Sequence, residues 1–311
     1  MGIRDTLLDL SVAWSFDQTG YLRHARGFDT RDLQVDLAHH TVVVTGANSG
    51  IGRAAASQLG SLGAHVVLAC RDPGRGEEAR AALSALGHRG SYSLELLDVG
   101  DLDSVTALAR RLNGPIHALI HNAGTAPPTR QQSRQGFELQ WATHVLGPTL
   151  LTQLWLPQLS KGKGRVITMS SGGMYTARLH LEDVAWEHRG YQKLAVYAHA
   201  KRAQVTLNET WARRHPGVVF HAAHPGWVDT PLVAQEMPAF HAALKDRLRT
   251  PDQGADTAVW LAASSTGGQH SGTFWFDRKP APVAVLPATR ATPAQAMALW
   301  DLCQAQLARH V

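Results

Sequence analysis

The chain has 311 residues, of which 44% are hydrophobic and 18% charged, and its formal net charge is +5 at pH 7. This length suits one large α/β domain with a substantial core, and no apolar run is long enough to span a membrane. The basic charge is scattered, which argues against nucleic-acid binding but would attract an anionic ligand. Cys70 and Cys303 are the only cysteines. They offer no disulfide framework and no metal-ligand spacing, so we expect a cytoplasmic protein without a metal site.

The first segment, residues 1–38, is predicted to be an extension rather than a domain. Its apolar side chains would pack on the main domain or on a partner subunit; they are Leu7, Leu8, Leu10, Val12, Trp14 and Phe16. An interfacial helix that touches a lipid surface is the alternative for this segment.

Residues 39–280 alternate between strand and helix patterns, which is typical of a parallel sheet covered by helices on both faces. The predicted strands are 41–46, 65–70, 92–97, 116–121, 165–170, 217–223 and 272–277. The predicted helices are 50–62, 74–86, 101–112, 133–160, 194–214 and 252–263. Residues 281–311 are predicted to form a connector and a C-terminal helix.

A glycine-rich turn, TGANSGIG at residues 45–52, lies between the first predicted strand and a helix. Strand, glycine-rich turn and helix form the unit that holds a pyrophosphate. Gly46 allows the tight turn, Gly50 lets the backbone approach the phosphates, and Gly52 lets helix and strand pack closely. This context predicts a Rossmann-like, doubly wound α/β fold of about seven strands that binds a dinucleotide.

Tyr197 and Lys201 are four residues apart in a predicted helix, so both side chains lie on one helix face. A phenol has a pKa of about 10, and a cation about 4 Å away would lower it by at most about three units. We therefore expect Lys201 to bring the Tyr197 phenol into the range that suits general acid–base chemistry.

An ordered set of motifs resembles the short-chain dehydrogenase/reductase family over about residues 38–280. The motifs are TGANSGIG (45–52), LLDV (96–99), HNAG (121–124), ITMSSGG (167–173), YAHAK (197–201) and HPGWVDTP (224–231). The resemblance implies a nicotinamide-dependent oxidoreductase.

The resemblance also implies catalytic roles. Tyr197 would donate the proton, Ser171 would hydrogen-bond the same substrate oxygen, and Lys201 would hold the nicotinamide ribose; Ser170 is the alternative to Ser171. His144 stands where the family often has an asparagine that links the lysine to solvent. The histidine would either replace that relay or make it pH-dependent, or it would be a helix residue with a satisfied ring.

The same resemblance implies a set of cofactor contacts. They are Gly46, Asn48, Ser49, Gly50, Ile51, Gly52, Arg71, Asp98, Val99, Asn122, Ala123, Gly124, Pro225, Gly226, Val228 and Thr230, together with Tyr197 and Lys201. Cys70 occupies the strand end where NAD-binding members carry a carboxylate, and Arg71 is placed to bind a 2′-phosphate. We therefore expect NADP(H) to be preferred over NAD(H). In the alternative interpretation, Arg71 is a surface residue paired with Asp72.

Aromatic and thioether side chains predict a small lipophilic carbonyl or alcohol substrate, although each could instead be core or interface. They are Met174, Tyr175, Leu179, Val184, Trp186, Tyr191, Trp227, Met237 and Phe240. The leading hypothesis is an NADP(H)-dependent carbonyl reductase or alcohol dehydrogenase. A non-catalytic NADP(H) sensor or scaffold is the second. Epimerisation or dehydration is the third, though such enzymes usually carry a larger substrate segment.

Relatives in the family commonly pair through the two long helices, here 133–160 and 194–214, so we expect a homodimer or homotetramer. A monomer would result if the N-terminal segment covered those faces.

Overall fold

The computed structural model describes residues 12–310, and in it eight strands form one sheet in the order β3-β2-β1-β4-β5-β6-β7-β8. The strands are β1 (Thr41–Thr45), β2 (His65–Cys70), β3 (Ser91–Leu96), β4 (Ala118–His121), β5 (Arg165–Met169), β6 (Val219–His224), β7 (Thr273–Phe276) and β8 (Lys279–Pro280). The first seven are parallel, which confirms the predicted fold. The two-residue β8, which no pattern predicted, pairs antiparallel with β7.

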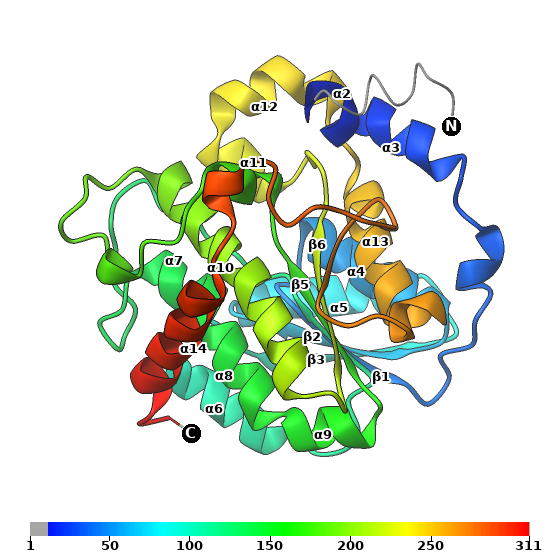
Figure 1. Ribbon diagram of the computed structural model, residues 1–311. Coiled ribbons are helices and arrows are strands. Elements are labelled where there is room, and N and C mark those ends of the chain that lie inside the picture. The colour runs from blue at the N-terminus through cyan, green and yellow to red at the C-terminus, as the bar shows by residue number, and fades with distance from the viewer. Residues whose placement is uncertain (1–11, 311) are drawn as a thin grey trace.

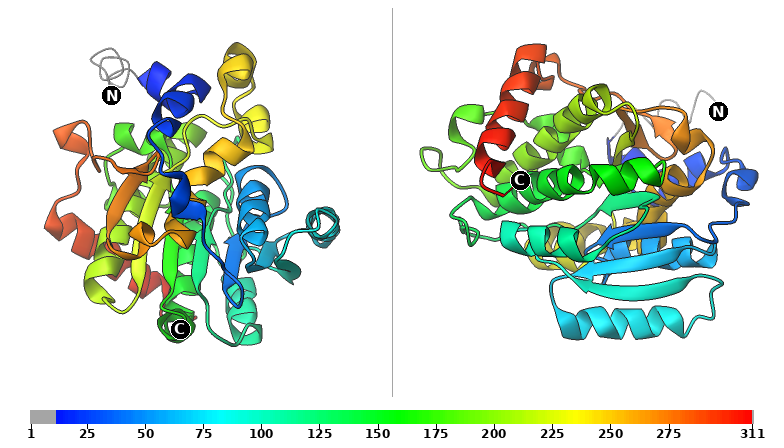
Figure 2. Two further views of the ribbon diagram at one scale, coloured as in Figure 1. Left: turned by 90° about the vertical axis from the view of Figure 1, so that its right-hand side faces the viewer. Right: turned by 90° about the horizontal axis from the view of Figure 1, so that it is seen from below.

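Helices cover both faces of the sheet (Figures 1 and 2). One face carries α4 (Gly50–Ser61), α5 (Pro73–Ser84) and α13 (Pro251–Ala263), and the other carries α6 (Leu102–Arg111), α8 (Gly147–Leu154) and α10 (Lys193–Arg214). The remaining α-helices are α2 (Val12–Phe16), α3 (Gln18–Ala25), α7 (Leu139–Trp141), α9 (Leu156–Lys161), α11 (Pro231–Glu236), α12 (Pro238–Leu244) and α14 (Pro293–Leu307). The two large hydrophobic clusters lie one on each side of the sheet, and a smaller third cluster includes Met174 and Phe274.

The central strands are buried on both faces, as a parallel sheet between two helix layers requires. Val43 of β1 lies in register with Val67 of β2 and with Leu119 of β4, and all three are fully buried. The chain builds β1, β2 and β3 in one direction and then returns to place β4 on the other side of β1. In α/β proteins, ligands bind beyond the carboxyl ends of the strands next to such a reversal.

The helix predicted over 133–160 begins later and is interrupted. Glu138 accepts hydrogen bonds from the N–H groups of Gln140 and Trp141, which starts α7 at Leu139. Residues before it form a turn closed by a bridge between Gln132 and Glu138. A π-helical turn, Ala142–Leu146, separates α7 from α8. Such turns occur mostly as single inserts, often at functional sites.

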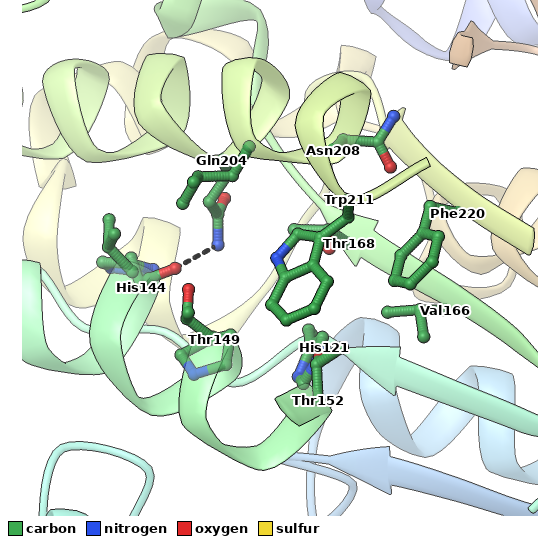
Figure 3. A pocket seen from close by; sticks show the side chains of 13 residues that line it. His121, His144, Thr149, Thr152, Val166, Thr168, Gln204, Asn208, Trp211 and Phe220 are labelled. Atoms are coloured by element: carbon green, nitrogen blue, oxygen red, sulfur yellow. Dashed lines mark hydrogen bonds between the residues drawn. The ribbon is translucent and has the colours of Figure 1, made fainter. Parts of the chain in front are cut away.

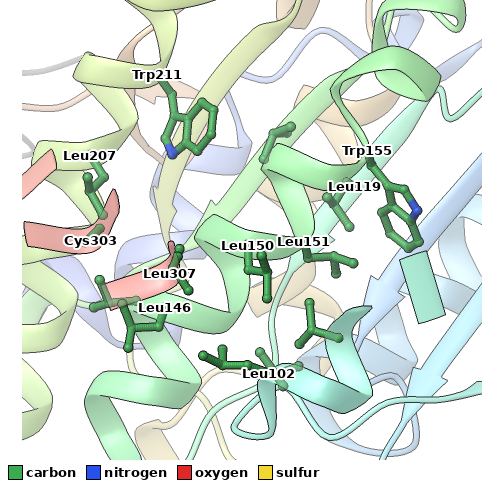
Figure 4. Packing of buried hydrophobic residues seen from close by; sticks show 14 of the residues in the cluster. Leu102, Leu119, Leu146, Leu150, Leu151, Trp155, Leu207, Trp211, Cys303 and Leu307 are labelled. Carbon is green, nitrogen blue, oxygen red and sulfur yellow. The ribbon is translucent and has the colours of Figure 1, made fainter. Parts of the chain in front are cut away.

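The C-terminal helix α14 is part of the core rather than a loose tail (Figure 4). Its Leu299, Cys303 and Leu307 are fully buried and share one hydrophobic cluster with Leu207 and Trp211 of α10. The indole of Trp300 also packs edge-on against that of Trp211, with ring centroids 4.7 Å apart. Helix α14 therefore covers α10, one of the two helices expected to pair with another subunit.

The N-terminal segment lies away from the C-terminal end of α14, with α2 beside α12 (Figure 1). Leu7, Leu8 and Leu10 lie outside the described residues, as does the side chain of Val12. Phe16 is half-buried against the main domain, whereas 45% of Trp14 is exposed. Among residues 12–310, no helix combines the length and apolar character needed to cross a bilayer.

Candidate active site

The turn after β1 has a backbone that favours glycine at two positions. The φ angle is +66° at Gly46 and +51° at Gly50. A Cβ on Gly52 would lie only 2.4 Å from the Gly46 carbonyl oxygen and 2.5 Å from Nδ2 of Asn122. Ser49, at the N-cap of α4, makes no side-chain cap hydrogen bond. The first N–H groups of α4 therefore lack a side-chain cap, and the positive helix end suits a phosphate here.

The end of β4 is fastened to the same turn. Asn122 Nδ2 donates to the carbonyl oxygens of Thr45 at 3.0 Å and of Gly46 at 3.3 Å. The backbone N–H groups of Asn122 and Ala123 both donate to Thr45 Oγ1, each at 3.0 Å. These bonds hold the segment that ends at Gly124 against the glycine-rich turn.

The segment of residues 225–230, here called the β6 loop, runs from the end of β6 toward the same turn. A Cβ on Gly50 would lie 3.3 Å from Cγ2 of Thr230. A Cβ on Gly254 would lie 2.6 Å from a methyl of Val228 and 3.2 Å from Cγ1 of Ile51. The β6 loop thus lies over the start of α4, opposite the segment of Asn122.

At the end of β2, the Cys70 side chain is buried beneath the glycine-rich turn. Its thiol accepts hydrogen bonds from the backbone N–H groups of Ala47 and Asn48, and burial raises its pKa to about 11. The group is therefore neutral at pH 7 and does not repel an anion. The next residue, Arg71, is exposed.

Asp72 is engaged elsewhere, contrary to the alternative that it pairs with Arg71. Its carboxylate caps α5 by accepting from the Arg75 N–H at 2.9 Å, and it forms an ion pair with Arg75 at 3.4 Å. This pairing with its own helix leaves the Arg71 guanidinium available to a ligand at the end of β2.

Asp98 and Val99 follow β3, the strand that pairs with β2, whose end carries Cys70 and Arg71. Asp98 Oδ1 accepts from the Gly100 N–H at 2.9 Å, and Ser104 Oγ accepts from the Asp98 N–H at 3.0 Å. Val99 is buried, with 5% of its surface exposed. Both residues therefore have fixed positions at the carboxyl edge of the sheet.

The predicted catalytic groups converge from two elements. Tyr197 and Lys201 share one face of α10, and the ammonium nitrogen of Lys201 lies 5.3 Å from the Tyr197 ring centroid. Ser171 follows β5 and hydrogen-bonds the Tyr197 side chain. Ser170, in contrast, donates its hydroxyl proton to the Lys201 carbonyl oxygen at 3.1 Å. Ser171 rather than Ser170 therefore faces Tyr197.

The expected lowering of the Tyr197 pKa is wrong for this structure. Burial raises the pKa of Tyr197 to about 12, and the hydrogen bond with Ser171 only partly opposes this. Burial also lowers the pKa of Lys201 to about 7, and its ammonium donates to the Met169 carbonyl oxygen at 2.8 Å. The phenol is therefore protonated at neutral pH, which is the form that donates a proton to a carbonyl oxygen.

His144 lies in the π-helical turn with its ring edge-on to Tyr197 at 5.3 Å. Its Nε2 lies 2.8 Å from the Thr125 carbonyl oxygen, whereas its buried Nδ1 has no partner in the described structure. Burial, and secondarily the charge of Lys201, hold the pKa of His144 well below its usual value. The ring is thus neutral, and only one of its two nitrogens has a hydrogen-bond partner. This fits neither a helix residue with a fully satisfied ring nor, by itself, a relay that replaces the asparagine.

A small cavity of about 30 Å³ lies next to His144, between the sheet and α8 and α10 (Figure 3). His121 and Gln204 also line it, and each has a buried polar atom without a partner in the described structure. The Gln204 amide donates to the His144 carbonyl oxygen at 2.8 Å. The volume and the unpaired polar atoms suit one or two water molecules.

Comparison with known proteins decides the family. A family model for short chain dehydrogenases matches residues 40–239. The chain belongs to the short-chain dehydrogenase family. It is also 40% identical over 314 aligned residues to Dehydrogenase/reductase SDR family member 12 from Bos taurus, covering 97% of this chain and 99% of that protein. The stretches SSGGMYTARL, VYAHAKRAQV and FDRKP resemble that subgroup, and this identity confirms the likeness.

Solved structures of short-chain dehydrogenases share this fold. An uncharacterized protein from Mycobacterium paratuberculosis is 31% identical with a TM-score of 0.74, covering 91% of this chain and 98% of that chain. A proposed NAD(P) dependent gluconate 5-dehydrogenase from Beutenbergia cavernae, with NADP bound at low occupancy, is 26% identical with a TM-score of 0.64. That match covers 78% of this chain and 96% of the other.

Five of the nine predicted substrate-lining residues fall into two clear groups. Met174, Leu179 and Val184 belong to hydrophobic core clusters and are at least 92% buried, so they are core residues. Trp227 and Phe240 are half-buried, and their rings meet edge-on with centroids 5.2 Å apart. Trp227 belongs to the β6 loop, and Phe240 belongs to α12, which follows that loop in the chain.

Sequence reasoning missed one contributor to this region. Phe16 of the N-terminal segment packs against His224, with ring centroids 4.3 Å apart. It also packs against Trp227, at 6.0 Å. The apolar pattern around Phe16 predicted that the segment packs on something, but no local signal links position 16 to position 224.

Proposed function

We propose that this short-chain dehydrogenase is an NADP(H)-dependent oxidoreductase that transfers hydride between nicotinamide and a small lipophilic carbonyl or alcohol. The observation that carries the proposal is the convergence of Ser171, Tyr197 and Lys201 after β5, at the carboxyl edge of the sheet that also carries the glycine-rich turn. The uncapped start of α4 and the absence of space for a Cβ at Gly52 fit a dinucleotide held by backbone.

The residues divide the chemistry between them. When bound, NADP(H) supplies or accepts the hydride. Tyr197 gives its phenolic proton to the carbonyl oxygen as negative charge develops there. Ser171 donates a hydrogen bond to the same oxygen, and the buried Lys201 holds the ribose and offers positive charge nearby. The half-buried Trp227 and Phe240 support an apolar substrate.

The cofactor preference is tested by replacing Arg71 with Ala. The variant should bind NADPH roughly 10- to 100-fold more weakly, because one charge-assisted bond to the 2′-phosphate contributes about 1.5–3 kcal/mol. NADH binding should stay within about twofold, since NADH has no such phosphate. Titration by tryptophan fluorescence measures both. Arg75→Ala is the matched control, because Arg75 pairs with Asp72. Equal losses for NADPH and NADH would contradict the assignment.

The alternative function, a non-catalytic NADP(H)-binding sensor or scaffold, would leave cofactor binding intact and differ only in turnover. We also propose a cytoplasmic location, which two buried, unpaired thiols support.

We propose that the chain is a monomer, in place of the expected homodimer or homotetramer. The C-terminal helix α14 buries Leu299, Cys303 and Leu307 against α10, and Trp141 donates from its indole N–H to Gln306 at 2.9 Å. A second subunit would have to displace this packing. Size-exclusion chromatography with light scattering should give the mass of one chain at micromolar concentration. A stable dimer would show that pairing uses another surface.

A further inference from the structure

The side chain of Phe16 contacts two segments near the proposed catalytic residues, the turn after β5 and the end of β6 with the loop that follows it. A Cβ on Gly172, the residue after Ser171, would lie 2.6 Å from Cε2 of Phe16. On the other side, the Phe16 ring packs edge-on against His224, the last residue of β6, and against Trp227 of the β6 loop. One residue from the N-terminal segment therefore bridges the turn after β5 and the loop after β6.

Main-chain bonds fix the β6 loop between the N-terminal segment and residue 249. The Trp227 N–H donates to the Phe16 carbonyl oxygen at 2.8 Å, and the Arg249 N–H donates to the Trp227 carbonyl oxygen at 2.7 Å. The Asp229 N–H then donates to the Arg249 carbonyl oxygen at 2.9 Å. The loop therefore lies between the end of α2 on one side and Arg249 on the other, and Val228 forms a single β-bridge with Arg249.

The side chain of Arg249 joins the same parts. It is fully buried, and it donates to the carbonyl oxygens of Ser15 at 2.9 Å, Asp17 at 3.1 Å and Pro225 at 3.3 Å. Its charge is balanced by Asp277, with nitrogen–oxygen distances of 2.6 and 2.8 Å. A buried, fully bonded guanidinium has a fixed geometry, so it fixes the loop relative to the N-terminal segment.

We propose that Phe16 and Arg249 are positioning residues for the nicotinamide half of the cofactor site. They hold the β6 loop, whose far end at Thr230 lies against Gly50, in the conformation that receives the nicotinamide. The proposal rests on the proposed function, because it takes this loop as the nicotinamide contact. The adenosine end, at Arg71 and Asp98, lies beyond β1 on strands β2 and β3, and neither positioning residue touches it.

The test compares two ligands in one variant. Phe16→Ala should raise the dissociation constant of NADPH about 10-fold. Without the Phe16 ring the β6 loop is no longer held in place, so NADPH binding has to order it. The constant for adenosine 2′,5′-bisphosphate, which lacks the nicotinamide, should stay within about twofold. Isothermal titration calorimetry measures both ligands, and thermal melting shows whether the fold is intact.

Phe28→Ala is the matched control. Phe28 belongs to the same segment and is also half-buried, but its ring contacts Tyr21 and Arg278 instead of the β6 loop. It should change neither dissociation constant. Arg249→Lys, which keeps a charge beside Asp277 but loses the forked donors, should reproduce the selective loss of NADPH affinity.

The outcomes separate the two proposals. If wild-type protein binds neither ligand, the proposed function fails and this inference fails with it. If wild-type protein binds both and Phe16→Ala weakens both equally, or weakens neither, the cofactor assignment stands and the positioning role is wrong.

Discussion

Replacing Tyr197 with Phe is expected to remove nearly all carbonyl reduction while leaving NADPH affinity within about twofold. The substitution deletes only the phenolic hydroxyl, the group that hydrogen-bonds Ser171 and is protonated at neutral pH. The ring keeps its edge-on contact with His144 and its place beside Lys201. A positioned general acid contributes about 10²- to 10⁴-fold in rate, so turnover should fall by that factor.

The measurement follows NADPH oxidation with a series of aromatic and aliphatic aldehydes, alongside a fluorescence titration of NADPH. Tyr92→Phe is the matched control, because that phenol bonds His88 at the far edge of the sheet. Turnover that survives in Tyr197→Phe would mean that another group donates the proton. Wild-type protein that binds NADPH but reduces no aldehyde or ketone would favour the sensor or scaffold.

Acid is expected to destabilise the fold steeply as pH falls below about 6.5. Five histidines are at least 96% buried, and burial lowers the pKa of each; they are His121 (to about 3), His144, His199 (to about 4), His221 (to about 4) and His224 (to about 3). Three of them also accept a hydrogen bond at a ring nitrogen. His221 accepts from the indole N–H of Trp275, His224 from the backbone N–H of Gly172, and His199 from the backbone N–H of His180. Protonation would break these bonds.

The sign follows from proton binding. Between the lowered folded-state pKa and the unfolded value near 6.5, the unfolded chain binds more protons than the native one, so stability rises with pH in this window. One pH unit below 6.5, each of these histidines lowers the free energy of unfolding by about 1 kcal/mol. The five together lower it by roughly 5–7 kcal/mol, which is comparable to the whole stability of a typical domain.

Urea unfolding at pH values from about 7.5 down to 5 measures this dependence. His121→Asn should reduce the steepness, because it removes one buried titrating ring. His39→Asn is the control, since His39 is exposed and its φ of +69° is one that asparagine accepts. A free energy of unfolding that stays flat down to pH 5.5 would show that these rings are protonated in the native state.

The parts of the molecule that sequence predicted are those with local causes. The run Val42–Val44 predicts a buried strand by its composition, and TGANSGIG predicts the turn because Gly46 and Gly50 need positive φ angles. Features that depend on long-range packing were not predictable. The rise in the Tyr197 pKa comes from burial, which the helical spacing to Lys201 does not report. The docking of α14 on α10 and the approach of Phe16 to His224 join residues far apart in the chain.

The two buried thiols have a practical consequence. Cys70 lies in the core on one side of the sheet and Cys303 in the core on the other, and burial raises the pKa of each. A thiol reagent can therefore modify either one only when the covering layer opens. Labelling kinetics at Cys70 would report breathing around the glycine-rich turn, and at Cys303 detachment of the last helix. The two native cysteines can thus report local opening of the helix layer on each side of the sheet, without any engineered probe.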